Sequence, residues 1–333
     1  MTWAALTVRL CRSVADHYPF PSLCGGSYLP VHDTTAMVVV LMALVLTLVA
    51  ARDATSLTPA MVGRVRDVTD GGAITILSPG EAVDIHCRNA PDLDQVRAAL
   101  EGEPVDVIAT MTEGRRKSLL IADMDSTIVT GETLDELAAY AGLGEQVAAI
   151  TARAMNGELD FKAALRERVA MLKSLSVVAL ERTWQRIRLT PGALELVATM
   201  KAHGAFTALI SGGFTFFTSR VAAVVGFDMH RSNELLDDGV RLLGLVKEPI
   251  LDRDTKLATL HELAARHCLP LSAALAVGDG ANDLDMLLAA GLGVAFHAKP
   301  IVSAATRARV DHADLRALLF AQGYPASAFA EIR

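Results

Sequence analysis

The sequence has few cysteines, and those it has lie far apart. Cys11, Cys24, Cys87 and Cys268 are the only ones in 333 residues, and no two form a CxxC pair. Structural zinc sites and disulfide frameworks both need closely spaced cysteines, so neither is indicated. Cysteines this sparse suit a reducing compartment, and we expect a cytoplasmic protein.

Basic residues are also in the minority. The 31 lysines and arginines are outnumbered by 38 aspartates and glutamates, which gives a formal net charge of -7. Proteins that bind nucleic acids usually present a basic face, so nucleic acid is not an expected partner. Apolar residues make up 52% of the chain and charged residues 21%, a composition that can bury a globular core, and the length allows two domains.

A membrane-spanning run is missing as well. In the one candidate stretch, residues 36–51, only Thr47 is polar, but the stretch is shorter than the roughly 20 residues that a spanning helix needs. A signal sequence or short anchor is the alternative, because Arg9 and Arg12 lie upstream. The valines favour a buried strand, and we expect no membrane partner. Met42 is a second candidate start, so the status of residues 1–41 stays open.

Residues 42–112 predict a small α+β domain, which a linker at residues 113–117 follows. Pro59 after Thr58 favours a helix start, and Gly71 and Gly72 favour a turn. The resulting βαββαβ order is the ferredoxin-like arrangement and resembles the small ACT-type ligand-binding domain, with a plain structural module as the alternative. The expected strands are residues 44–50, 73–77, 82–87 and 105–111, and the expected helices are residues 59–68 and 93–100.

Residues 118–333 predict an α/β fold with a Rossmann-like parallel sheet. Apolar runs at residues 118–122, 205–210 and 273–277 each end abruptly in polar or glycine residues, which is typical of strands buried on both faces of a parallel sheet. Ligands bind at the carboxyl ends of such strands, so we expect the three polar ends to share one pocket. Residues 134–190 are rich in helix formers and too long for a simple connection, which predicts a helical cap.

Two carboxylates directly follow the first of these runs. Asp123 and Asp125 lie where both can face a cation. A calcium loop of the EF-hand type begins with the same spacing, but it needs a glycine and a glutamate where Ile128 and Leu134 stand. A helix N-cap with a spare acid is the other alternative, and it accounts for only one aspartate.

The second run ends in a segment suited to phosphate. Taken alone, Ser211, Gly212 and Gly213 are equally consistent with a plain turn. At a strand end, however, they offer a hydroxyl and backbone N–H groups to phosphate oxygens. Lys256, taken in isolation, is expected to be a solvated surface lysine.

The third run ends in the acidic segment GDGAND, residues 278–283. Its Asp279, Asn282 and Asp283 crowd oxygen atoms together, which is costly unless a cation neutralises them. Asp123, Asp125 and Asp279 together would make an oxygen-rich Mg²⁺ site that also accepts a phosphate.

These segments resemble the four ordered motifs of the haloacid dehalogenase-like phosphatases. DMDST at residues 123–127 matches the first motif, SGG at residues 211–213 the second, Lys256 the third and GDGAND the fourth. The segments at residues 131–133, 154–157, 160–161 and 165–169 also resemble the cap of the phosphoserine phosphatases. The resemblance covers residues 118–319.

The resemblance implies a chemistry and a role for each matched residue. Asp123 would attack phosphorus and form an aspartyl phosphate, with Asp125 as general acid and base. Mg²⁺ would be bound by Asp123, Asp279 and the backbone carbonyl of Asp125. The residues expected around the phosphate are Ser211, Gly212, Lys256 and Asn282, with Thr127, Gly213 and Asp283 in support.

The resemblance also implies the substrate, O-phospho-L-serine, and therefore the last step of serine biosynthesis. Arg168 would bind its carboxylate and Glu132 its ammonium group. Met155 and Phe161 would form an apolar wall that excludes water. The alternatives left open are phosphohomoserine, phosphothreonine, phosphate transfer to an alcohol, and a non-catalytic amino-acid sensor. An amino-acid effector at residues 42–112 and a homodimer are the further candidate partners.

Overall fold

The computed structural model describes residues 44–155 and 159–332, and at positions 152, 154 and 155 it describes the backbone only. Residues 1–41 and the Met155 side chain, both singled out from the sequence, therefore lie outside the described part. Within the described ranges, no helix is long and apolar enough to cross a membrane.

A four-stranded sheet forms first along the chain, with the order β2-β3-β1-β4 and antiparallel pairing throughout. The βαββαβ order predicted from the sequence is found. The apolar stretch that raised the question of a membrane ends in β1, an inner strand that is buried over six of its seven residues. The elements are β1 (Leu44–Ala50), α2 (Pro59–Val68), β2 (Gly71–Ser78), β3 (Ala82–Cys87), α3 (Leu93–Ala99) and β4 (Val105–Met111).

The segment predicted as a linker contains a buried anchor, Arg115. Its guanidinium donates two hydrogen bonds to the carboxylate of Asp84, at 2.6 and 2.7 Å, and one to the hydroxyl of Thr47 at 2.7 Å. It also donates to the carbonyl of Ala321 at 2.8 Å. A buried carboxylate needs such a partner, so this side chain fixes the four-stranded sheet to the part of the chain that follows.

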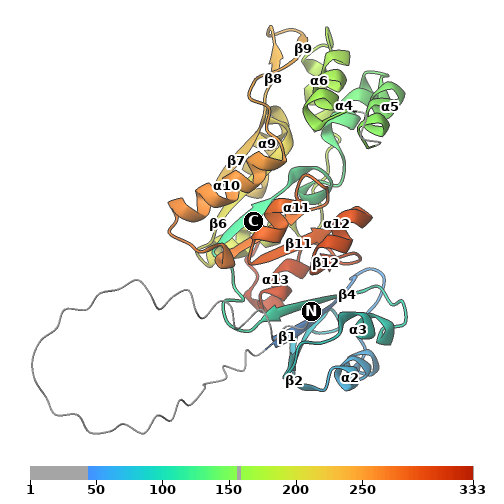
Figure 1. The fold of residues 1–333 in the computed structure, drawn as a ribbon, viewed down its shortest axis with the longest axis vertical. Coiled ribbons are helices and arrows are strands. Elements are labelled where there is room, and N and C mark those ends of the chain that lie inside the picture. Colours follow the sequence, from blue (N-terminus) through green and yellow to red (C-terminus); the bar gives the residue numbers. More distant parts are fainter. Residues whose placement is uncertain (1–43, 156–158, 333) are drawn as a thin grey trace, which may run out of the picture. The chain divides into compact units, whose positions relative to one another are not determined.

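A six-stranded sheet follows, with the order β12-β11-β10-β5-β6-β7 (Figure 1). All five strand pairs are parallel, as predicted. The strands are β5 (Leu119–Ala122), β6 (Phe206–Phe214), β7 (Met229–Asn233), β10 (Ala274–Gly278), β11 (Leu292–Phe296) and β12 (Ala308–Val310). The α-helices beside them are α8 (Ala193–Ala202), α9 (Thr215–Val225), α10 (Arg253–Arg266), α11 (Leu284–Ala289), α12 (Pro300–Ala305) and α13 (Ala317–Ala321). The short turns are η1 (Met124–Ile128), η2 (Leu271–Ala273) and η3 (Ala326–Ala328). The three apolar runs of the sequence lie in β5, β6 and β10, and β5 pairs with both of the others.

Four helices between β5 and β6 form the predicted cap. They are α4 (Thr133–Tyr140), α5 (Gly144–Met155), α6 (Phe161–Met171) and α7 (Val178–Trp184). A hairpin of β8 (Leu235–Asp237) and β9 (Leu242–Val246) packs on α6, at the upper end of Figure 1. Leu242 joins the two by exchanging backbone hydrogen bonds with Ser174 and Leu175. The sequence reasoning missed this hairpin, because it begins at Leu235, far along the chain from the last cap helix, which ends at Trp184.

Candidate active site

The first site residue is set by the way β5 ends. Asp123 directly follows the strand in extended backbone geometry, and its N–H donates to the carbonyl of Val277 in β10 at 3.0 Å. The chain then turns sharply at Ser126, whose φ of 54° lies in the left-handed region. The turn is closed by a bond from the Ser126 N–H to the Gly131 carbonyl. Asp123 is thereby held next to the end of β10, from which Asp279 follows.

Lys256 is a buried member of the site. It lies in the first turn of α10, which begins with a capping box between Asp252 and Thr255, and only 1% of the residue is exposed. Its Nζ lies 2.7 Å from Asp123 Oδ1 and also contacts the carboxylate of Asp283. Burial alone would lower the pKa of Lys256, but Asp123 and Asp283 hold it above its ordinary value, so the ammonium group stays charged. A surface role for this lysine is excluded.

Three carboxylates gather around Lys256. Oxygen atoms of Asp123, Asp279 and Asp283 lie within 4.8 Å of one another, the one such group of three in the part of the chain that the structure describes. Burial, then the charge of Asp283, raises the pKa of Asp279 to about 7. The same two causes raise the pKa of Asp123 well above its ordinary value.

This acidic group fits a divalent cation. One lysine cannot balance the charge of three carboxylates. Asp123 Oδ1 lies in ion-pair contact with Lys256 Nζ, but the two atoms lack the alignment of a hydrogen bond. This oxygen therefore accepts no hydrogen bond in the described structure. Hard cations such as Mg²⁺ prefer carboxylate oxygens of this kind. Asp283, expected only in a supporting role, lies in the group, whereas the Asp125 side chain does not belong to it.

Asp125 lies between the start of cap helix α4 and the end of β6. Its carboxylate accepts hydrogen bonds from the Thr133 N–H at 2.8 Å and from the Ser211 hydroxyl at 3.3 Å. Burial, then the charge of Glu132, raises its pKa to about 6. A carboxyl group with such a pKa exchanges its proton easily near neutral pH, which is the property that general acid–base chemistry needs.

The end of β6 requires its second glycine. A Cβ at Gly213 would stand 2.8 Å from Asp125 Oδ2 and 3.0 Å from Ser211 Oγ, so a larger residue would displace both side chains. The Gly213 N–H itself donates to Ser211 Oγ at 2.8 Å. At Gly212, a Cβ would stand 3.4 Å from the ring of Phe161, so cap helix α6 faces the end of β6.

The cap supplies the other charged side chains. The carboxylate of Glu132 accepts a 2.7 Å hydrogen bond from the Ser126 hydroxyl. Within the described residues, the Arg168 guanidinium forms no ion pair, and its only hydrogen bond is a long one of 3.4 Å to the Ala164 carbonyl of its own helix. Burial lowers the pKa of Arg168, and the negative charges of Asp135 and Glu132 oppose this shift. Most of the hydrogen-bonding capacity of this guanidinium is therefore free.

The remaining two residues that the sequence predicted for the site are Thr127 and Asn282. The hydroxyl of Thr127 is buried and has no hydrogen-bond partner in the described structure. Asn282 is partly exposed, in the same loop as Asp279. Sequence reasoning missed Asn233, which donates to the Gly212 carbonyl near the end of β6, because nothing in the pattern around it marks a buried amide.

The chain is similar to known proteins over the part that carries these residues. The family described as haloacid dehalogenase-like hydrolase matches residues 120–288. A phosphoserine phosphatase from Archaeoglobus fulgidus is 43% identical over 66% of this chain and 65% of its own length. One from Streptococcus thermophilus is 46% identical over 60% of this chain and 93% of its own length.

The likeness extends to solved structures. A probable phosphoserine phosphatase from Vibrio cholerae matches with a TM-score of 0.70 at 33% identity, over 86% of this chain and 88% of that one. Several curated relatives are longer than the matched part: the chain spans 65%, 55%, 64% and 51% of four phosphoserine phosphatases.

Proposed function

The chain belongs to the haloacid dehalogenase-like hydrolases, and on that premise we propose that it is a Mg²⁺-dependent phosphatase that converts O-phospho-L-serine to L-serine and phosphate. The observation that carries the chemistry is the contact of Asp123 with a fully buried, charged Lys256 beside Asp279. The named relatives, all phosphoserine phosphatases, support the choice of substrate.

Asp123 is the nucleophile in this proposal. One of its carboxylate oxygens attacks phosphorus, and the bond from phosphorus to the serine oxygen breaks as the aspartyl phosphate forms. Water then attacks phosphorus, which releases phosphate and restores the carboxylate. Lys256 offsets the negative charge of the phosphoryl group in both steps. When bound, Mg²⁺ would be held by Asp123 and Asp279, with Asp283 and the Asp125 carbonyl beside them, and would supply further positive charge.

Asp125 moves the protons. In the first step it donates one to the departing serine oxygen, and in the second it accepts one from the attacking water. Its pKa near 6 suits both directions. The bonds from Thr133 and Ser211 fix the orientation of the carboxyl group in the site, so no rearrangement is needed between the steps.

The cap selects the amino-acid end of the substrate. A phosphoserine molecule carries a carboxylate and an ammonium group opposite its phosphate, and Arg168 and Glu132 offer one charge of each sign. The free donors of Arg168 suit a carboxylate, because a guanidinium can bind one through two parallel hydrogen bonds. Phe161, whose ring lies where it would meet a Cβ at Gly212, would exclude water between the two ends.

The direct test is phosphate release from phosphoserine, with Mg²⁺ and with a chelator, beside phosphothreonine and phosphohomoserine. We expect release only with Mg²⁺, and the highest kcat/KM for phosphoserine. No release from any of them would refute the phosphatase, whereas a higher kcat/KM for an analogue would replace the substrate. Added serine or homoserine that diverts phosphate from water would instead indicate a phosphotransferase.

The role of residues 42–112 is a separate part of the proposal. We retain an amino-acid effector for this ACT-like region, and calorimetry of the full chain with serine or glycine tests it. Absence of binding outside the active site would leave the region with a structural role only. A homodimer and a cytoplasmic location stay predictions.

A further inference from the structure

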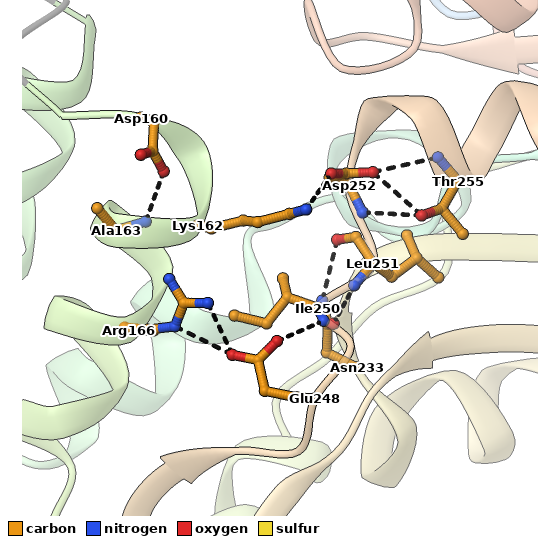
Figure 2. Close-up of polar contacts among 10 residues, drawn as sticks. All are labelled: Asp160, Lys162, Ala163, Arg166, Asn233, Glu248, Ile250, Leu251, Asp252 and Thr255. Atoms are coloured by element: carbon orange, nitrogen blue, oxygen red, sulfur yellow. Dashed lines mark hydrogen bonds and ion pairs between the residues drawn. The ribbon is translucent and has the colours of Figure 1, made fainter.

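Asn233 is a buried amide whose hydrogen bonds join two parts of the site. It is the last residue of β7 and only 3% exposed. Its Nδ2 donates to the Gly212 carbonyl at 2.8 Å, and its Oδ1 accepts from the Leu251 N–H at 2.7 Å. A longer contact of 3.4 Å joins Nδ2 to the Leu251 carbonyl. Figure 2 shows the side chain in contact with the segment that precedes α10.

The two segments that Asn233 joins each lead to a site residue. Gly212 lies between Ser211 and Gly213 near the end of β6. Leu251 precedes Asp252, the N-cap of α10, and the Lys256 N–H donates to the Asp252 carbonyl one turn later. Leu251 and Gly212 lie far apart in the sequence, yet one side chain fixes the backbone of both.

Only an amide satisfies both ends of this link. The Gly212 carbonyl needs a donor and the Leu251 N–H needs an acceptor, and an asparagine side chain supplies one of each. A carboxylate of the same shape would turn an acceptor toward two carbonyl groups. An apolar side chain would leave three buried polar groups without partners, which is costly for each.

We propose that Asn233 is a positioning residue, which holds the backbone at the end of β6 and the start of α10 at the spacing that lets Ser211, Gly213 and Lys256 act on one phosphate. The proposal rests on the proposed function. In the described part of the chain, no side-chain hydrogen bond of Asn233 reaches the acidic group or the cap, so it acts through the residues that it holds. Displacements of about 1 Å in such a frame cost on the order of 10²-fold in rate.

The test is Asn233→Asp, assayed on phosphoserine and on p-nitrophenyl phosphate, which has no amino-acid end. We expect kcat to fall about 10- to 100-fold for both substrates, with the ratio of their KM values unchanged, because the cap is intact. Glu234→Gln is the matched control, because Glu234 is the next residue, is exposed, and among the described residues forms an ion pair only with Lys247, and it should keep wild-type kinetics.

The outcomes separate this inference from the proposed function. An inactive wild-type protein would refute the phosphatase itself. An active wild type with an equally active, folded Asn233→Asp would overturn the positioning role, and so would a change confined to the KM for phosphoserine. If Asn233→Asp does not fold, Asn233→Ser is assayed with the same two readouts. Serine is too short to bridge Gly212 and Leu251 but keeps a small polar group at this position.

Discussion

The two halves of the candidate site differ in how firmly the protein holds them. The half at the strand ends is buried, with no member more than 7% exposed. The half on the cap is open, with Phe161 37% exposed and Glu132 largely in solvent. The strand-end half comprises Asp123, Ser211, Lys256, Asp279 and Asp283, and the cap half comprises Glu132, Phe161 and Arg168.

On the proposed function, the strand-end half carries out the reaction and the cap half recognises the substrate. At the strand ends, each charge already has a partner or a cation-binding geometry before any ligand arrives, and fixed charges of this kind stabilise a transition state without reorganisation. On the cap, Arg168 has donors to spare, so its interactions form when a substrate binds and the cap closes. Variants of the first half should therefore abolish turnover, and variants of the second should change which substrate is preferred.

The largest effect is expected for Asp123→Asn. An amide at this position cannot attack phosphorus, so hydrolysis of every phosphomonoester should be lost. The fold should survive, because the raised pKa of Asp123 means that its charge is disfavoured in the metal-free site. Activity measured beside the thermal midpoint checks both points. Substantial turnover in this variant would refute the nucleophile assignment.

Asp125→Asn should come next, with kcat lower by about 10²- to 10⁴-fold, the usual contribution of one general acid or base. Substrate binding should change little, because the amide oxygen can still accept from the Thr133 N–H, and the amide nitrogen can donate to the Ser211 hydroxyl in place of the bond that the carboxylate accepts there. Single-turnover kinetics and inhibition by inorganic phosphate measure the two properties separately. A large loss of phosphate affinity with unchanged kcat would assign Asp125 to binding instead.

Arg168→Ala tests the cap half. Loss of two charge-assisted hydrogen bonds should raise KM for phosphoserine by about 10- to 100-fold, with little change for p-nitrophenyl phosphate. Arg182→Ala, on the neighbouring cap helix α7, is the control for cap stability. Equal effects of Arg168→Ala on both substrates would remove the basis for the phosphoserine assignment.

A smaller effect is expected in the pH dependence of Mg²⁺ binding, which tests the strand-end half. Because the pKa of Asp279 is raised to about 7, the folded metal-free protein binds more protons than the unfolded chain, and its stability falls as the pH rises toward 7. Mg²⁺ needs the ionised carboxylate, so its apparent affinity should fall by up to about tenfold per pH unit below 7. Calorimetric titration with Mg²⁺ between about pH 6 and pH 8 measures this, and Asp279→Asn should weaken the dependence and leave the part that belongs to Asp123, whose pKa is also raised. An affinity independent of pH would remove Asp279 from the metal site.

The sequence predicted that the strand-end residues lie close together, because short apolar runs that end in Asp123, Ser211 and Asp279 indicate one edge of a parallel sheet. Lys256 could not be found in this way. Nothing in the helical pattern around it marks a buried lysine, and only the family resemblance singled it out. That its ammonium group is buried against two carboxylates depends on contacts between β5, α10 and the loop after β10, which no local pattern encodes.

The cap half was predicted less completely, for a physical reason. Its helices follow from composition, but the hairpin of β8 and β9 joins them through the backbone of Leu242, and backbone bonds leave little trace in side-chain patterns. Asn233 was missed for a similar reason. A polar residue at the end of a strand usually faces solvent. Asn233 is instead buried, with its side chain hydrogen-bonded to Gly212 and Leu251.

The smallest effect is expected where the two halves meet on the surface. Two ion pairs join cap helix α6 to the segment before α10: Lys162 lies 2.7 Å from Asp252, and Arg166 lies 2.7 Å from Glu248 (Figure 2). Both pairs are solvent-exposed, and such pairs contribute about 0–1 kcal/mol each and weaken with salt. The closed cap should therefore be easy to open.

Lys162→Gln combined with Arg166→Gln should change kcat/KM for phosphoserine only a few-fold, by favouring the open cap, and should remove part of the salt dependence that the wild type shows. Arg266→Gln is the control, because its ion pair with Glu262 lies within α10 and leaves the cap contacts intact. A double variant as salt-sensitive as the wild type would mean that these pairs do not hold the cap. The apolar ring of Phe161, which faces Gly212, would then be what holds the cap in place, since apolar packing gains rather than loses strength in salts that favour burial.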